Sequence, residues 1–358
     1  KYTKHTMLAA EPQQTQAKAK QRDEAKKKGE GEGEKENGMS EEDMQLHVEK
    51  FIMTEEQGKV HLQLKQELKK NGLVDVPSFC SDEEITRFCK ARNFDFKKAY
   101  KMMSEAVEWR RKAKPQNLMP KMVEDQSITG KTYVAGKDKF GRPVVVMDSS
   151  CENSTDHNKK IEFLLFNLEY AKKLMEGNVD KWVLWIYLDN FSFWSAPPMK
   201  TGMETNRCLM LRYPERMGHC FLYKPPTLFG MVWKMASPLI DPRTKKKIHF
   251  MHGNFDQASQ NHQKLAKLMG ENWRDLVGLD AEHSKTKARG YEHKTYWKQV
   301  QKAFGEEAED TKDNDTAASE NNKEEVNKTP QTATQNGIPA PQGAAPPAPT
   351  AAAPAAPK

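Results

Sequence analysis

The chain has 358 residues and a hydrophobic content of 37 %, which is low for a chain that is folded throughout. Residues 41–304 hold 44 Lys and Arg against 34 Asp and Glu, whereas residues 305–358 hold 4 against 9. The middle of the chain is therefore basic, which favours an anionic partner such as nucleic acid or anionic lipid. The five cysteines form no Cys-x-x-Cys pair, so their spacing indicates neither a metal site nor a disulfide framework.

The two ends of the chain have compositions that do not support a core. Residues 1–45 are rich in Lys, Gln, Glu and Gly, and residues 305–358 pass from an acidic stretch into a Pro/Ala run. Such segments bury too little apolar surface to offset their conformational entropy. We expect both to be disordered tails.

Residues 46–118 are predicted to form a helical subdomain. A capping box at Thr54 begins a first helix. Ser81 begins a second helix and Asp95 a third, which Pro115 must end. Apolar residues recur at helical spacing in the first and third segments, which predicts that these helices share a core.

From Pro143 onward the pattern changes to short apolar runs separated by helical segments. The runs are residues 144–147, 182–188, 219–223 and 248–251. Their apolarity is continuous rather than alternating, which indicates strands covered on both faces. Residues 119–285 are therefore predicted to be an α/β domain with a mostly parallel sheet, followed by a C-terminal extension at 286–304.

The sequence offers no recognisable catalytic site. Residues 130–132, Gly-Lys-Thr, end like a phosphate-binding loop, but Asp125 stands where that loop requires a glycine. Asp148 and Asp189 follow predicted strands, where open α/β sheets place their sites. A single carboxylate in that position more often caps a helix or a loop. We expect no enzyme, no cofactor and no metal.

No segment predicts a permanent membrane anchor. No early apolar run resembles a signal peptide, and the longest uninterrupted apolar run, residues 182–188, is far shorter than the roughly 20 residues that span a bilayer. We therefore expect a cytoplasmic protein that associates with membranes only peripherally.

Residues 227–237 form a short predicted helix that is apolar on nearly every side. Pro226 can begin it and Pro238 must end it. A helix of this kind is either buried in a core or serves as a lid, with one face on a lipid cavity and the other on a membrane. The sequence leaves both alternatives open.

Four motifs stand in order along the chain. They are FCKARNFD at residues 88–95, DKFGRPV at 138–144, YPERMG at 213–218 and DPRT at 241–244. In sequence and order they resemble the CRAL-TRIO family of phosphatidylinositol transfer proteins, over roughly residues 54–279. The resemblance implies a helical subdomain followed by a sheet whose helices form a lipid-binding cavity.

The resemblance also implies a headgroup site. In the family, four side chains hold the inositol phosphate, and the matching positions here are Arg92, Glu215, Thr244 and Lys247. The chemistry is consistent, because Arg92 and Lys247 can neutralise a phosphodiester while Thr244 donates a hydroxyl to it. Glu215 can accept hydrogen bonds from inositol hydroxyls.

The sequence does not determine the identity of a second lipid ligand. The family's polar cluster for phosphatidylcholine is represented by Tyr133, whereas Val145 and Trp194 stand where polar groups are expected. We expect the cavity wall to include, with Tyr133, four apolar residues: Leu209, Phe221, Phe229 and Val232.

Membrane contact is expected beside the apolar helix. Trp233 lies within it, and the basic residues Lys245 and Lys246 follow it closely. Each charge near an anionic bilayer contributes about 1 kcal/mol of attraction.

These features predict a monomeric, phosphatidylinositol-binding lipid transfer or lipid-presenting protein that exchanges single lipids at membrane surfaces. Its partners would be a phospholipid, a transiently contacted membrane and, as a candidate, a phosphoinositide kinase. Nucleic acid is disfavoured, because aromatic and basic residues do not interleave. The alternative is a lipid-sensing signalling or trafficking adaptor that recruits a partner through its Pro-rich tail.

Overall fold

The computed structural model describes residues 52–76, 79–191, 198–284 and 286–306. The predicted disordered tails and Trp194 lie outside the described residues, apart from the first two positions of the C-terminal tail.

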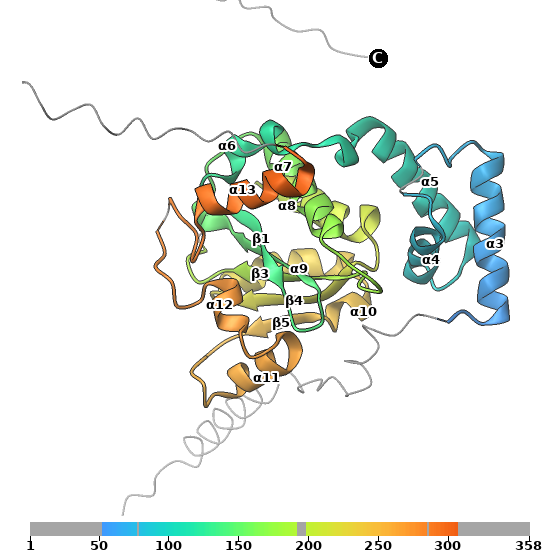
Figure 1. Cartoon of the computed structure of the whole chain (residues 1–358). Coiled ribbons are helices and arrows are strands. Elements are labelled where there is room, and N and C mark those ends of the chain that lie inside the picture. The colour runs from blue at the N-terminus through green and yellow to red at the C-terminus, as the bar shows by residue number, and fades with distance from the viewer. Residues whose placement is uncertain (1–51, 77–78, 192–197, 285, 307–358) are drawn as a thin grey trace, which may run out of the picture. The chain divides into compact units, whose positions relative to one another are not determined.

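Three capped helices form the helical subdomain (Figure 1). They are α3 (Glu55–Lys70), α4 (Asp82–Ala91) and α5 (Phe96–Ala113). The side chains of Thr54, Ser81 and Asp95 each accept a hydrogen bond from a backbone N–H in the first turn that follows, and the capping box at Thr54 is complete. The helices share one core, in which Leu64, Phe88 and Met103 are fully buried. The predicted helix starts are confirmed.

A five-stranded sheet forms the centre of the second part of the chain. Its strands are β1 (Thr132–Lys137), β2 (Pro143–Asp148), β3 (Trp182–Tyr187), β4 (Met217–Tyr223) and β5 (Ile248–Met251). They lie in chain order, with β1 antiparallel to β2 and the other neighbours parallel. The predicted mostly parallel α/β fold is confirmed. The sequence reading missed β1, because Gly136 interrupts it and the register shifts there.

Helices cover both faces of the sheet (Figure 1). The first face packs against α7 (His157–Lys173), η4 (Cys208–Arg212), α9 (Phe229–Ala236) and α13 (His293–Phe304). The second face packs against α11 (Gln260–Met269) and α12 (Trp273–Val277). Shorter elements complete the described chain: η1 (Pro115–Asn117), η2 (Pro120–Met122), α6 (Glu124–Ser127), η3 (Ser149–Cys151), α8 (Met199–Arg207), η5 (Ser237–Leu239) and α10 (Pro242–Lys245).

The predicted C-terminal extension is part of the core. Trp297 and Val300 of α13 are buried in the cluster on the first face of the sheet. The hydroxyl of Tyr296 accepts a hydrogen bond from the backbone N–H of Val134, next to the irregularity in β1. The helix therefore satisfies an edge-strand donor that the interrupted ladder leaves without a strand partner.

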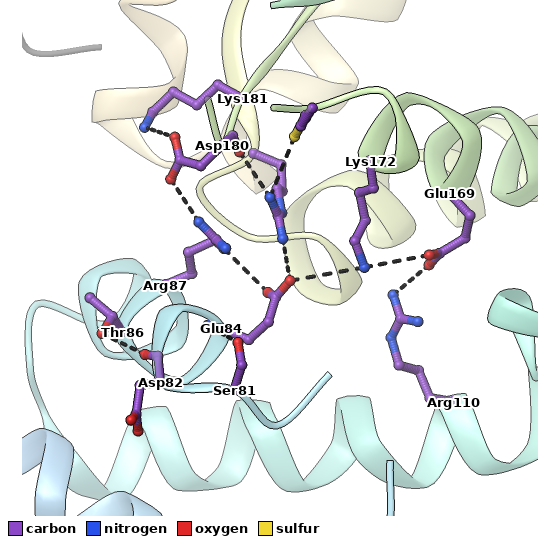
Figure 2. A network of polar contacts seen from close by, with 12 residues as sticks. Ser81, Asp82, Glu84, Thr86, Arg87, Arg110, Glu169, Lys172, Asp180 and Lys181 are labelled. Carbon is purple, nitrogen blue, oxygen red and sulfur yellow. Dashed lines mark hydrogen bonds and ion pairs between the residues drawn. The ribbon is translucent and has the colours of Figure 1, made fainter. Parts of the chain in front are cut away.

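A buried ionic network joins the helical subdomain to the sheet domain (Figure 2). The carboxylate of Glu84 in α4 forms ion pairs with Arg87 of the same helix and with Arg216, which directly precedes β4. Arg87 also reaches Asp180, with its Nη1 2.7 Å from the Oδ2 atom. Glu84 is 5 % and Arg216 6 % exposed, so these charges depend on one another for compensation.

The network continues along α5 and α7 (Figure 2). Arg110 of α5 lies 2.7 Å from the Oε1 atom of Glu169 in α7, and the Tyr213 hydroxyl donates to the same oxygen at 2.6 Å. Lys172 lies between the two carboxylates, 3.9 Å from Glu84 and 3.4 Å from Glu169. The helical subdomain and the sheet domain are thus held together by a row of buried side chains in which acidic and basic groups alternate.

Replacing Glu84 tests the contact between the helical subdomain and the sheet domain that this buried network forms, here called the seam. Glu84→Gln leaves Arg216, Arg87 and Lys172 with less compensation, and we expect it to lower the free energy of unfolding by about 3 to 5 kcal/mol in urea titrations. Glu83→Gln is the matched control, because Glu83 is the exposed neighbour on the same helix turn. It should change stability by at most about 1 kcal/mol. Equal effects of the two substitutions would contradict a structural role for the network.

The same variant has a defined pH dependence. Burial disfavours the charged form of Glu84, but Arg216, Arg87 and Lys172 outweigh it and lower the pKa of the carboxyl below its ordinary value of 4.5. A lowered carboxyl pKa stabilises the fold above the ordinary value, and this stabilisation is lost as pH falls through the lowered value. The difference in the free energy of unfolding between wild type and Glu84→Gln should therefore be largest at neutral pH and should shrink below pH 4.5.

Candidate functional site

One pocket at the seam is lined by all four predicted headgroup residues. Arg92 follows α4, Glu215 precedes β4, Thr244 lies in α10 and Lys247 directly precedes β5. The pocket has a cavity volume of about 100 Å³ and opens to solvent. Its lining is completed by apolar residues from the end of α4, from η4 and from the segment that leads into β4, and by two polar residues of the α10 turn, namely Ala91, Leu209, Met210, Leu211, Pro214, Met217, Asp241 and Arg243. Residues 155 positions apart in sequence thus meet at one concave surface.

The YPER motif divides its side chains between the seam and the pocket. Tyr213 and Arg216 bind the buried carboxylates Glu169 and Glu84. Glu215 lies between them with a left-handed backbone, φ 58°, a conformation that non-glycine residues rarely adopt. The flanking contacts to the network hold this conformation and leave the Glu215 carboxylate at the pocket.

The DPRT turn builds the opposite wall. Asp241 is the N-cap of α10, and its side chain accepts from the backbone N–H groups of Arg243 and Thr244 at 2.8 and 3.4 Å. Pro242 follows as the first helical residue, where its missing N–H costs nothing. This cap fixes the turn that carries Arg243 and Thr244.

Positive charge is concentrated at the pocket. Arg243 and Lys247 each lie 3.9 Å from a different oxygen of Glu215, too far for strong hydrogen bonds. Lys247 also donates to the carbonyl of Met217 at 3.3 Å, and Arg243 to that of Lys90 at 3.1 Å. One carboxylate is therefore shared by two cations that still have donors to offer.

Burial shifts the pKa values of two lysines at and beside the pocket. It lowers the pKa of Lys247 below its ordinary value, with nearby Lys181 and Arg243 acting in the same direction and Glu215 opposing them. The pKa of Lys90 is lowered in the same way, by burial first and then by Lys181. Because an opposite charge favours the charged form of an ammonium group, a phosphate group at this position would counteract the lowering of the Lys247 pKa.

An apolar strip lies on the first face of the sheet beside the pocket. The strip comprises Met147, Ile186, Ile248 and Phe250, which are only partly buried although they lie in the middle of the fold. Phe229 and Trp233 of α9 pack on Phe250, with ring centroids 6.4 and 5.0 Å away. Sheet side chains on the opposite face, such as Val146 and Trp185, are fully buried. The first face therefore carries a strip of apolar surface that protein side chains cover incompletely.

The structure corrects part of the predicted cavity wall. Leu209 and Phe229 pack on the first face, but Tyr133 and Phe221 belong to the core of the second face. Successive strand residues point to opposite faces, so these two cannot line a cavity with the others. The Tyr133 hydroxyl instead donates to the carbonyl of Arg289 at 3.0 Å. Val232 of α9 is half-buried.

Helix α9 exposes one apolar face and covers the sheet with the other. Leu228, Met231 and Met235 are between 51 and 55 % exposed. The predicted membrane-contact residue Trp233 is half-buried against Phe250. Of the two basic candidates, Lys246 is exposed and Lys245 half-buried. The helix is thus not enclosed in the core, which favours the lid over the buried-helix alternative.

Sequence reasoning missed two contributors to the pocket, Arg243 and Asp241. Both lie in the DPRT turn, and an Asp followed by Pro is a recognisable helix start. The motif could therefore have identified the capping role of Asp241. The direction of the Arg243 side chain could not be inferred, because it depends on Glu215 and on the Lys90 carbonyl, which come from two other segments.

Comparison with known proteins agrees with this architecture. The profile of the CRAL/TRIO domain matches residues 128–271, and that of the CRAL/TRIO N-terminal domain matches residues 60–105. The first match contains Glu215, Thr244 and Lys247, and the second contains Arg92. The chain belongs to the CRAL-TRIO family. This is a family of lipid-binding and lipid transfer proteins.

Relatives of this CRAL-TRIO chain include proteins from two yeasts. It is 30 % identical over 183 residues to the CRAL-TRIO domain-containing protein C23B6.04c of Schizosaccharomyces pombe, covering 51 % of this chain and 18 % of that protein. It is 25 % identical over 231 residues to the phosphatidylinositol transfer protein PDR17 of Saccharomyces cerevisiae, covering 61 % of each. The chain thus spans less than two thirds of the length of these relatives. The crystal structure of Sfh5 is similar with a TM-score of 0.45 and 14 % identity, over 62 % of this chain and 85 % of that one.

No helix among the described residues is both long enough and apolar enough to cross a membrane.

Proposed function

We propose that this CRAL-TRIO protein binds phosphatidylinositol, with the inositol phosphate in the pocket and the acyl chains along the apolar strip, and exchanges single lipids at membrane surfaces. The observation that carries the proposal is the convergence of Arg92, Glu215, Thr244 and Lys247 on one pocket next to that strip. A phosphoinositide needs both parts, an anion site with hydroxyl acceptors and an adjoining apolar surface.

Each pocket residue has a defined role in this proposal. Lys247, Arg243 and Arg92 neutralise the phosphodiester, and the Thr244 hydroxyl donates to it. Glu215 accepts from inositol hydroxyls, and its loose ion pairs at 3.9 Å can rearrange without breaking a strong bond. The relatives support this ligand, because PDR17 is a phosphatidylinositol transfer protein by name. No residue in this scheme carries out a chemical reaction.

Helix α9 is the element that would release the lipid. Phe229 and Trp233 cover the strip at Phe250, while Met231 and Met235 are exposed on the other side. Exposed apolar surface gains about 25 cal/mol per Å² when it enters a bilayer. Contact with a membrane would therefore draw α9 away from the sheet and open the strip.

The adaptor alternative depends on the Pro-rich tail, which lies outside the described residues. A phosphoinositide kinase would be the recipient in the lipid-presenting form of the proposal.

Removing two pocket charges tests the headgroup assignment. Glu215→Ala with Lys247→Ala should reduce phosphatidylinositol transfer between vesicles by at least about tenfold, because each lost charge-assisted hydrogen bond is worth about 1.5 to 3 kcal/mol. Glu271→Ala with Lys101→Ala is the control, since both residues are exposed and away from the pocket and the net charge is the same. Circular dichroism checks that both variants fold, and mass spectrometry of the extracted lipid checks its identity. Unchanged transfer by a folded pocket variant would exclude the assignment.

A charge on the exposed face of α9 tests the lid. Met231→Asp should weaken sedimentation with anionic vesicles by about tenfold or more while leaving thermal stability nearly unchanged. Met122→Asp is the matched control, because Met122 is 57 % exposed and lies in η2. Hydrogen exchange in α9 should also increase when vesicles are added. Exchange as slow as in β3, with and without vesicles, would mean that α9 is a static part of the core.

A further inference from the structure

A second cluster of polar side chains lies at the carboxyl end of β2, on residues that the lipid site does not use. Asp148 ends β2, Cys151 ends η3 and His283 lies in the segment after α12. One carboxylate oxygen, the sulfur and one ring nitrogen lie within 4.8 Å of one another. The Nε2 atom of His283 is 3.1 Å from Asp148 Oδ2 and 3.7 Å from Cys151 Sγ.

One atom of the cluster is buried without a hydrogen-bond partner. Asp148 is 1 % exposed, and its Oδ1 atom accepts from the backbone N–H and the hydroxyl of Ser150 at 3.0 and 2.5 Å. Its Oδ2 atom accepts no hydrogen bond from the described residues. The Nε2 atom of His283 lies 3.1 Å from this oxygen and also 3.1 Å from the Ser150 hydroxyl, which a metal ion would have to displace. A buried carboxylate oxygen without a partner costs several kcal/mol, so the arrangement calls for a cation.

The charges around the cluster also favour a bound cation. Arg289 pairs with Asp189 through its Nη2 atom and lies 4.0 Å from Asp148 Oδ2. With neutral His283, two buried or half-buried carboxylates thus share one guanidinium, which leaves one negative charge. A divalent cation together with ionised Cys151 brings this site to neutrality.

We propose that Asp148, Cys151 and His283 bind a zinc ion, independently of the lipid site. Carboxylate oxygen, thiolate sulfur and imidazole nitrogen are the three protein ligand types of zinc. Tetrahedral zinc places its ligand atoms about 3.3 to 3.8 Å apart, close to the separations around His283 Nε2. Water completes the fourth position.

Binding of zinc releases one proton, that of the Cys151 thiol. In the metal-free protein the Cys151 thiol donates to the carbonyl of Ser284 at 3.4 Å. Zinc displaces this proton to solvent and binds the thiolate. The Asn190 amide lies 3.5 Å from His283 Nδ1. The atom that faces the ring is the amide nitrogen. With zinc bound, the amide would turn so that its oxygen accepts the Nδ1 proton, which leaves the Nε2 lone pair for the metal.

The ion would join two segments far apart in sequence. Asp148 and Cys151 belong to the end of β2, and His283 to the segment that leads to α13. Since α13 packs on the first face of the sheet, zinc would tie this segment to the sheet and stabilise the attachment of α13.

Cobalt(II) is the probe for the site. Metal-free full-length protein titrated with Co²⁺ should show a thiolate-to-cobalt charge-transfer band and tetrahedral visible bands that saturate at one equivalent, and Zn²⁺ should abolish them by displacement. Cys151→Ser should remove the charge-transfer band. Cys80→Ser is the matched control and should retain it, because Cys80 is a half-buried cysteine of the helical subdomain. Zn²⁺ should raise the melting temperature of wild type and of Cys80→Ser but not of Cys151→Ser.

The other two ligands make the test specific. His283→Gln and Asp148→Asn should each weaken cobalt affinity by at least about tenfold, the loss that even outer-sphere changes cause at metal sites. Asn at position 148 keeps the cap on η3, so folding is retained. The proposal is overturned if no charge-transfer band forms, if the band survives in Cys151→Ser, or if both His283→Gln and Asp148→Asn bind as wild type does. A protonated His283 paired with Asp148 would give the first of these results.

Discussion

The buried pairing of Glu84 with Arg216 is the contact on which the proposed lipid site depends. Arg92 belongs to the helical subdomain, whereas Glu215, Thr244 and Lys247 belong to the sheet domain. The pocket exists only while the two parts hold one relative position. Apolar contacts alone would allow sliding, but ionic partners buried at both ends must remain paired, because a lone buried charge is far more costly than a shifted side chain. Directional charges thus fix the geometry of the anion site.

This arrangement explains why one short motif serves two purposes. Tyr213 and Arg216 reach into the seam, and Glu215 between them reaches into the pocket. The left-handed conformation of Glu215 is sustained by its neighbours and not by its own preference. Seam residues and pocket residues therefore alternate within four positions, and a change in the seam would also move the carboxylate that lines the pocket.

The two faces of the sheet differ in how completely helices cover them. The second face is closed by α11 and α12 with fully buried aromatic residues such as Trp185 and Trp273. The first face keeps the apolar strip, under a helix whose other side is exposed. Both faces carry a buried core, but only the first face has this incompletely covered strip, so α9 can move away while the rest of both cores stays closed. This separation suits a protein that must open to exchange an apolar ligand.

Much of this protein could be predicted from its sequence. Caps at Thr54, Ser81 and Asp95 begin the helices, and four apolar runs became strands, because these signals act over a few residues. The proposed headgroup residues were predicted by resemblance to a family, residue by residue, and all four line one pocket.

Tertiary structure decided what depends on distant partners. The side of the sheet that Tyr133 and Phe221 face follows from strand register, which a single continuous apolar run does not reveal. Arg243 joins the pocket because its partners, Glu215 and the Lys90 carbonyl, come from other segments. The cluster of Asp148, Cys151 and His283 is absent from any local spacing, because 132 positions separate its cysteine from its histidine. Sequence thus determined the local elements and the family. Only the fold determined which side chains meet, since their contacts are set by packing between segments far apart in the chain.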